Sequence, residues 1–188
     1  TTFFIKIDTF DSQIFPKFCI FLVGGLLFFL IGIHDDIFKS SPLLRLFLQF
    51  IVAFFVALGG INFGALNFYF PYIGEVKTLI PPAFNYILSA FWIVGTTNSI
   101  NWLDGIDALA GGYCSILSIG LCATMLYQDN YIGVLFFSII LGSIIGFLIR
   151  NFKPAFYIMG DCGSNFLGFC FAAGSILFLP NTIDGSIN

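Results

Sequence analysis

Six long apolar stretches, separated by polar loops, dominate this 188-residue chain. Hydrophobic residues make up 59% of the sequence and charged residues only 9%, whereas a soluble domain carries about 25% charged residues. So few charges cannot solvate a folded surface, and lipid is therefore the expected solvent for most of the chain. The stretches lie at about residues 18–33, 43–60, 83–95, 106–127, 131–149 and 165–179.

A transmembrane helix needs about 20 mostly apolar residues, and the six stretches approach or reach that length. We therefore predict an all-α, polytopic membrane protein with about six transmembrane helices. Residues 1–188 are expected to form a single transmembrane domain. Because the chain starts in one polar stretch and stops in another, we expect an internal fragment of a larger helical bundle.

Acidic residues gather in the loops of one side. Counting crossings puts residues 34–42, 96–105 and 150–164 on the same side of the bilayer. An Asp at the centre of a transmembrane helix costs about 2.5–3.5 kcal/mol, so these acids are expected at the interface or in a wet cavity, where they are candidates for one shared site. Five of the ten acids lie in or beside the three loops, namely Asp35, Asp36, Asp104, Asp107 and Asp161.

The first loop carries two adjacent carboxylates, Asp35 and Asp36, followed by Lys39. Adjacent carboxylates repel one another, so the pair needs a cation or a raised pKa. One interpretation is a metal–phosphate site in which one carboxylate acts as a base. The alternative is a solvated acid pair balanced by Lys39 and Arg45.

The second loop has a polar residue at every third position, Asn98, Asn101, Asp104 and Asp107. On one continuous helix the first and the last would face opposite ways, whereas a break near Gly105 lets all four converge. Amides suit a sugar or uracil, and carboxylates suit a metal or ribose hydroxyls. The alternative is a capped helix start near the positive end of the helix dipole.

The third loop contains Asp161 between two glycines, in Gly160-Asp161-Cys162-Gly163-Ser164. The glycines allow a tight turn and the close approach of a phosphate to backbone N–H groups. Ordinary turns share this pattern, so its location beside the other two loops is what favours a functional interpretation. His34 is the only histidine and is expected to be structural.

Together the three loops resemble the polyprenyl-phosphate sugar-1-phosphate transferases, or glycosyltransferase family 4, over about residues 32–168. This family includes the phospho-N-acetylmuramoyl-pentapeptide and the undecaprenyl-phosphate N-acetylglucosamine types. The specific part of the match is Asn101-x-x-Asp104-Gly105-Ile106-Asp107 with Leu109-Ala110-Gly111, together with Met159-Gly160-Asp161-x-Gly163-Ser164. Ala108 departs from a family glycine, and Ile158 from an aromatic residue for which Phe156 or Tyr157 could substitute.

The resemblance implies that a polyprenyl phosphate attacks a UDP-sugar, releases UMP and yields a polyprenyl-diphospho-sugar for cell wall or lipopolysaccharide synthesis. It implies Mg²⁺ as cofactor, with Mn²⁺ as a substitute. It further implies a bacterial inner membrane, a site facing the cytoplasm, no nucleic acid partner and compatibility with a homodimer. By residue, the implied roles are catalytic for Asp35, Asp36 and Asp104, metal-binding for Asp161, and substrate-binding for Lys39, Asn98, Asn101, Asp107 and Asn151.

Two other functions fit parts of the pattern. A cation-coupled transporter would use carboxylates to bind its ion, but its acids should lie near the midplane of the bilayer. A CDP-alcohol phosphotransferase would need a longer Asp-rich motif than residues 104–107 provide. We therefore favour the sugar-phosphate transferase and keep the transporter as the alternative.

Overall fold

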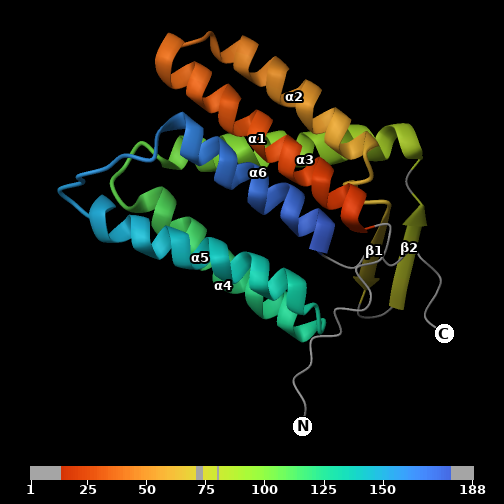
Figure 1. The fold of residues 1–188 in the computed structure, drawn as a ribbon. Coiled ribbons are helices and arrows are strands. Elements are labelled where there is room, and N and C mark those ends of the chain that lie inside the picture. The colour runs from red at the N-terminus through yellow and green to blue at the C-terminus, as the bar shows by residue number, and fades with distance from the viewer. Residues whose placement is uncertain (1–13, 71–73, 80, 179–188) are drawn as a thin grey trace.

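The computed structural model describes residues 14–70, 74–79 and 81–178, which form six α-helices and one β-hairpin (Figure 1). The predicted fold class, a helical membrane protein, is confirmed. The helices are α1 (Ile14–Phe38), α2 (Pro42–Leu58), α3 (Pro82–Leu103), α4 (Leu109–Tyr127), α5 (Tyr131–Asn151) and α6 (Gly160–Phe178).

The hairpin lies in the loop between α2 and α3 and was not predicted. Its strands β1 (Ala65–Phe70) and β2 (Gly74–Leu79) are antiparallel, with Ala65 opposite Leu79 and Phe70 opposite Gly74. The hairpin lies at the far end of the bundle from the loops that carry the acids (Figure 1). It therefore takes no part in positioning the candidate site.

Helix α6 is the centre of the bundle. In its most apolar window 67% of the residues are buried, against 28% in the corresponding windows of α1, α4 and α5. Helix α6 packs against α1 and α3, while α2 covers α1 and α3 from outside and α4 pairs with α5 (Figure 1). The residue that carries the third motif, Asp161, thus stands on the best-anchored helix.

Two glycines let α6 approach its neighbours closely. A Cβ atom on Gly168 of α6 would lie 2.5 Å from the Cα atom of Thr97 in α3. A Cβ atom on Gly32 of α1 would collide with the backbone of Asp161 and Cys162. Because interiors are close-packed, these contacts hold the site-bearing ends of α1, α3 and α6 together backbone to backbone.

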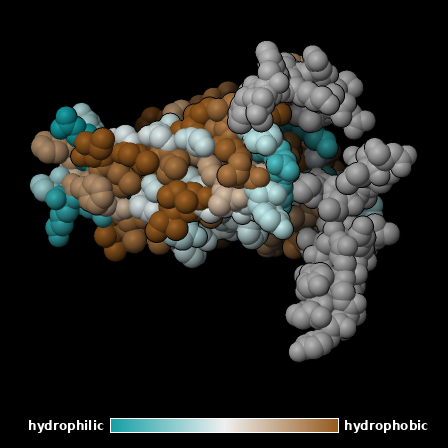
Figure 2. Space-filling model, turned by 90° about the horizontal axis from the view of Figure 1, so that it is seen from below, coloured by the Kyte–Doolittle hydropathy of each residue, from teal (hydrophilic) through white to brown (hydrophobic). Residues whose placement is uncertain are grey.

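Among the described residues, four helices are long and apolar enough to cross a membrane, namely α1, α4, α5 and α6. Helix α2 is apolar but has only 17 residues. Large apolar side chains are exposed along the bundle, and hydrophilic residues gather toward its ends (Figure 2). The molecule is therefore a multi-pass membrane protein, whereas the crossings by α2 and α3 stay predictions.

Candidate active site

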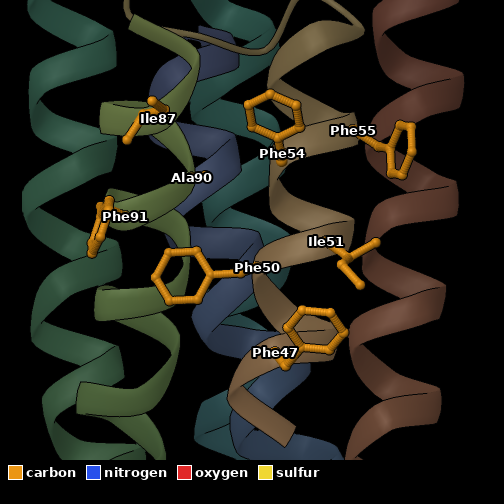
Figure 3. A pocket seen from close by; sticks show the side chains of 8 residues that line it. All are labelled: Phe47, Phe50, Ile51, Phe54, Phe55, Ile87, Ala90 and Phe91. Carbon is orange, nitrogen blue, oxygen red and sulfur yellow. The ribbon is translucent and has the colours of Figure 1, made fainter. Parts of the chain in front are cut away.

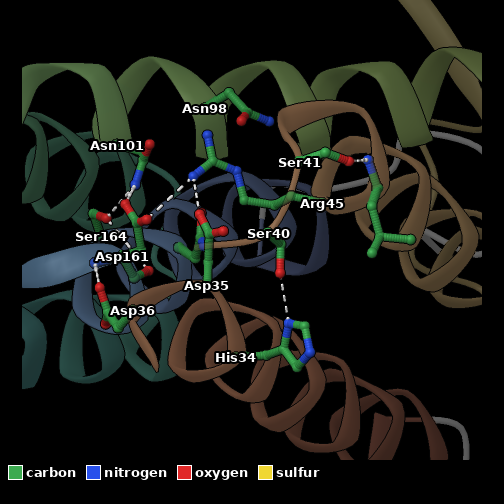
Figure 4. Close-up of polar contacts among 12 residues, drawn as sticks. His34, Asp35, Asp36, Ser40, Ser41, Arg45, Asn98, Asn101, Asp161 and Ser164 are labelled. Carbon is green, nitrogen blue, oxygen red and sulfur yellow. Dashed lines mark hydrogen bonds and ion pairs between the residues drawn. The ribbon is translucent and has the colours of Figure 1, made fainter. Parts of the chain in front are cut away.

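The three acidic loops meet at one end of the bundle, where α1 and α3 end and α2 and α6 begin (Figure 4). Arg45, in the first turns of α2, links the first loop to the third. Its guanidinium donates to a carboxylate oxygen of Asp35 at 2.5 Å and, through the same nitrogen, to Asp161 at 3.2 Å. The first and third motifs are therefore neighbours, although their acids stand 126 positions apart in the sequence.

Asp161 also contacts the second motif. Asn101, near the end of α3, donates its amide to Asp161 at 2.5 Å and to the hydroxyl of Ser164 at 2.8 Å. The side chain of Asn101 points toward Asp161, while that of Asn98 points away from it (Figure 4). Asp161 thus accepts from an amide and from a guanidinium at once, which orients its carboxylate between α2 and α3.

Asp36 caps the central helix. Its two carboxylate oxygens accept from the backbone N–H groups of Asp161 and Cys162, at 2.9 and 3.0 Å. The first N–H groups of a helix have no partner within the helix, and a carboxylate there also interacts favourably with the dipole. The close backbone contact at Gly32, one turn earlier on α1, brings Asp36 into reach. Both carboxylate oxygens of Asp36 therefore already accept hydrogen bonds from the protein backbone.

Asp104 completes the acidic cluster, in the loop between α3 and α4. Burial raises the pKa of Asp104 to about 6, and the nearby charges of Asp161 and Asp36 add to this rise. Four carboxylates, those of Asp35, Asp36, Asp104 and Asp161, lie near one paired guanidinium, that of Arg45, in the described part of the chain, so negative charge exceeds positive charge there. A bound cation would restore the balance.

Asn98 and Asn151 make protein contacts in place of pointing into the cluster. The Asn98 amide donates to Gln49 at 2.7 Å. Asn151 is buried; its side chain accepts from the N–H of Ala108 at 2.9 Å and donates to the carbonyl of Tyr157 at 2.7 Å. Asn151 thus ties the loop before α4 to the loop before α6.

Lys39 and Asp107 are exposed at the same end of the bundle. Within the described residues Lys39 makes no ion pair, and it has a left-handed backbone with φ of +48°. His34 bonds through its Nδ1 atom to the hydroxyl of Ser40 at 2.8 Å, which fits the structural role expected for it. The exposed side chains of Lys39 and Asp107 are therefore accessible to a ligand that arrives from solvent.

Sequence reasoning gave Arg45 only the part of a counter-charge and did not single out Ser164 or Gln49. The pairing of Arg45 with Asp161 spans 116 positions, so no local pattern reveals it. A signal was present, because Arg45 is a lone cation at the start of an apolar helix. A charge at the edge of an apolar helix is expected to have a partner.

The sequence model of glycosyl transferase family 4 matches residues 18–179. The chain belongs to this family. It is 35% identical, over 86% of its length, to the Bacillus subtilis protein named "Probable undecaprenyl-phosphate N-acetylglucosaminyl 1-phosphate transferase", of which the match covers 44%. It is 34% identical, over 92% of its length, to a "Phospho-N-acetylmuramoyl-pentapeptide-transferase" from Lactobacillus delbrueckii subsp. bulgaricus, of which the match covers 56%. The chain thus spans about half the length of these curated relatives.

The helical bundle also carries an apolar groove. It lies between α2 and α3 and has a volume of about 290 Å³ (Figure 3). Phe47, at one end of the groove, stands two positions after Arg45. The groove is lined by Phe47, Phe50, Ile51, Phe54, Phe55, Ile87, Ala90 and Phe91.

The carboxylates of this site fit Mg²⁺ only if a substrate supplies further oxygen ligands. Among the described residues no group of three or more His, Cys, Asp or Glu is arranged to hold a metal. Mg²⁺ usually binds through one or two carboxylates together with substrate phosphates and water. Asp161 and the neighbouring Asp104 provide such carboxylates, and the excess negative charge around them favours a cation.

Proposed function

We propose that the full-length protein transfers a sugar 1-phosphate, with an N-acetylhexosamine as the sugar, from a UDP-sugar to a polyprenyl phosphate such as undecaprenyl phosphate. An oxygen of the lipid phosphate bonds to the β-phosphorus of the donor, the bond from that phosphorus to the α,β-bridging oxygen breaks, and UMP leaves. The polyprenyl-diphospho-sugar product serves cell-envelope glycan synthesis. The Asp35–Arg45–Asp161 bridge, in a chain of this family, carries the proposal.

The main barrier to this reaction is electrostatic, because two phosphate groups must approach one another. Mg²⁺ bound at Asp161, or Mn²⁺ in its place, would neutralise phosphate oxygens and polarise the reacting phosphorus. Arg45 supplies a second positive charge beside the same carboxylate. Asp104 lies near Asp161 and Asp36. We assign it a catalytic role beside the reacting phosphates and their cation.

We assign Asp35 and Lys39 to the lipid phosphate. Asp35 is buried against Arg45, so the pair can orient a phosphate through the guanidinium. The second pKa of a phosphate monoester is about 6, so the nucleophile is largely ionised at neutral pH and a base is not essential. Both oxygens of Asp36 are held by α6, so its assigned contribution is to hold the end of that helix.

The nucleotide-sugar end is assigned to the second and third loops. Asn101 and the exposed Asp107 offer an amide and a carboxylate to sugar or ribose hydroxyls. Phe156 is 78% exposed, so its ring is free to stack on uracil. The Asn151 clamp on the Tyr157 carbonyl holds the loop that carries this ring.

The groove between α2 and α3 is assigned to the first part of the polyprenyl chain. Its aromatic and aliphatic lining suits an isoprenoid tail, and its Phe47 end lies within one helical turn of Arg45 along α2. UDP-sugars are made in the cytoplasm, so the site is assigned to the cytoplasmic face of the bacterial inner membrane.

The test is UMP release by the purified full-length protein in detergent with Mg²⁺, undecaprenyl phosphate and a panel of UDP-sugars. We expect release with a UDP-N-acetylhexosamine and none when the lipid phosphate is left out. No UMP with any sugar, combined with ion-driven uptake in proteoliposomes, would favour the transporter alternative. The position of the acids at helix ends argues against that alternative, since transported ions bind near the midplane.

A further inference from the structure

A second set of polar side chains lies one helical turn inside the acidic cluster. Residues three or four apart share a helix face, so three helices each present a site residue and an amide on one face. We call Gln49, Asn98 and Asn165 the amide layer. Each member stands about one turn from the site residue of its own helix: Gln49 after Arg45 on α2, Asn98 before Asn101 on α3, and Asn165 after Asp161 on α6.

The amide layer is one chain of hydrogen bonds across three helices. The side-chain amide of Asn98 donates to Oε1 of Gln49 at 2.7 Å, and the side-chain amide of Gln49 donates to Oδ1 of Asn165 at 3.2 Å. Gln49 and Asn165 are both 0% exposed. A buried amide is costly unless it is hydrogen-bonded, so sliding or rotating α2 against α3 or α6 would break bonds that nothing replaces.

The layer is a poor arrangement for stability alone. The side-chain nitrogen of Asn165 is buried and has no partner in the described part of the chain. Leaving such a donor unpaired costs about 1–3 kcal/mol, whereas apolar side chains of similar shape can be neutral or stabilising. The site above depends on geometry, however, because one nitrogen of Arg45 must reach two carboxylates from different helices.

We propose that the amide layer is a positioning element, which sets the rotation and depth of α2 against α3 and α6 so that Arg45 reaches both Asp35 and Asp161. Asn98 then acts through Gln49 rather than on the substrate. The effect on catalysis rests on the function proposed above, but the hydrogen-bonded coupling of the three helices does not.

The kinetic test uses Gln49→Leu and Gln49→Glu in the full-length protein. Leu keeps the volume and removes both bonds, so we expect kcat to fall about tenfold, with KM for the UDP-sugar changed less than about twofold. The carboxylate of Glu can accept a hydrogen bond from Asn98. After a 180° rotation of the Asn165 side-chain amide, it can also accept one from the nitrogen of Asn165 that is unpaired in the parent. It should therefore recover activity relative to Leu, and adding Asn165→Leu should abolish that recovery.

Thr97→Val is the matched control, because Thr97 is buried next to Asn98 and its hydroxyl donates to the carbonyl of Ile93 in its own helix. Its kcat should stay within about twofold of the parent. A Gln49→Leu protein with parental kcat, or a Gln49→Glu protein less active than Gln49→Leu, would overturn the proposal, because a packing role alone favours Leu.

A melting experiment in detergent tests the layer without any activity. Gln49→Leu, Asn165→Leu and the double variant form a double-mutant cycle. If the two side chains are bonded as one unit, the shift in Tm of the double variant will differ from the sum of the single shifts. Additive shifts would overturn the proposal even in an active enzyme. A coupled layer in a protein that releases no UMP would support the layer and reject the proposed function.

Discussion

At the scale of single residues, Ala108 shows a departure from the family pattern with a physical consequence. The family resemblance implies Gly at this position, and the φ of Ala108 is +63°. A left-handed backbone brings the Cβ atom too close to the following carbonyl, at a cost of about 1–2 kcal/mol. The bond from its N–H to buried Asn151 holds this conformation in place.

Replacing Ala108 with Gly should therefore stabilise the protein by about 0.5–1 kcal/mol, because relief of the strain exceeds the entropy that glycine adds to the unfolded chain. Ala110→Gly is the control, since Ala110 is buried within α4 and should lose about 1 kcal/mol. Thermal unfolding in detergent measures both. Destabilisation by Ala108→Gly would show that the left-handed conformation carries no strain.

Arg45 is the residue for which charge and geometry matter together. In Arg45→Gln the carboxylates of Asp35 and Asp161 lose their shared cation, so kcat/KM for UMP release should fall about 10²-fold. Arg45→Lys keeps the charge without the planar fork and should lose less. Arg150→Gln removes an exposed cation at the same end of the bundle, outside the Asp35–Arg45–Asp161 bridge, and should change kcat/KM by less than about twofold. Equal losses in the two Gln variants would indicate only a general charge effect.

At the scale of elements, each of the six apolar stretches overlaps a helix, and some helices extend beyond the apolar stretch. Helix α3 continues to Leu103 rather than stopping near residue 95, because Thr97 and Ser99 bond back to carbonyls of their own helix and Asn98 bonds to α2. Helix α6 starts at Gly160 rather than near 165, because Asp36 supplies the cap. The partners of Asn98 and Asp36 lie on other helices, and hydropathy alone does not reveal them.

The α1–α6 contact gives a prediction at this scale. Gly32→Ala should lower the Tm and the activity together, since its Cβ atom would meet backbone that cannot move aside, and overpacking costs about 1–3 kcal/mol. Gly142→Ala in α5 has no neighbour within 4 Å and should be neutral or stabilising. Melting and UMP release test both variants. A Gly32→Ala protein that melts like the parent would mean that α1 can shift away from α6.

At the scale of the whole molecule, counting crossings predicted that three loops share a side, and the structure brings them into contact. The sequence could not reveal how they meet, because the decisive pairs, such as Arg45 with Asp161 and Asn101 with Ser164, join distant helices. The insertion cost of carboxylates explains why the acids gather at one end. Close packing at Gly32 and Gly168 explains why they meet there rather than merely face the same side.

The most direct test of a shared, cation-dependent site is Mg²⁺ titration of UMP release by the full-length protein and its Asp161→Asn variant. Asn keeps the shape of Asp161 but removes the charge. We expect kcat to fall at least about 10²-fold and the Mg²⁺ concentration for half-activation to rise. The control Asp129→Asn, at the opposite end of the bundle in the α4–α5 turn, should match the parent. Parental activity and Mg²⁺ dependence in Asp161→Asn would contradict the shared site.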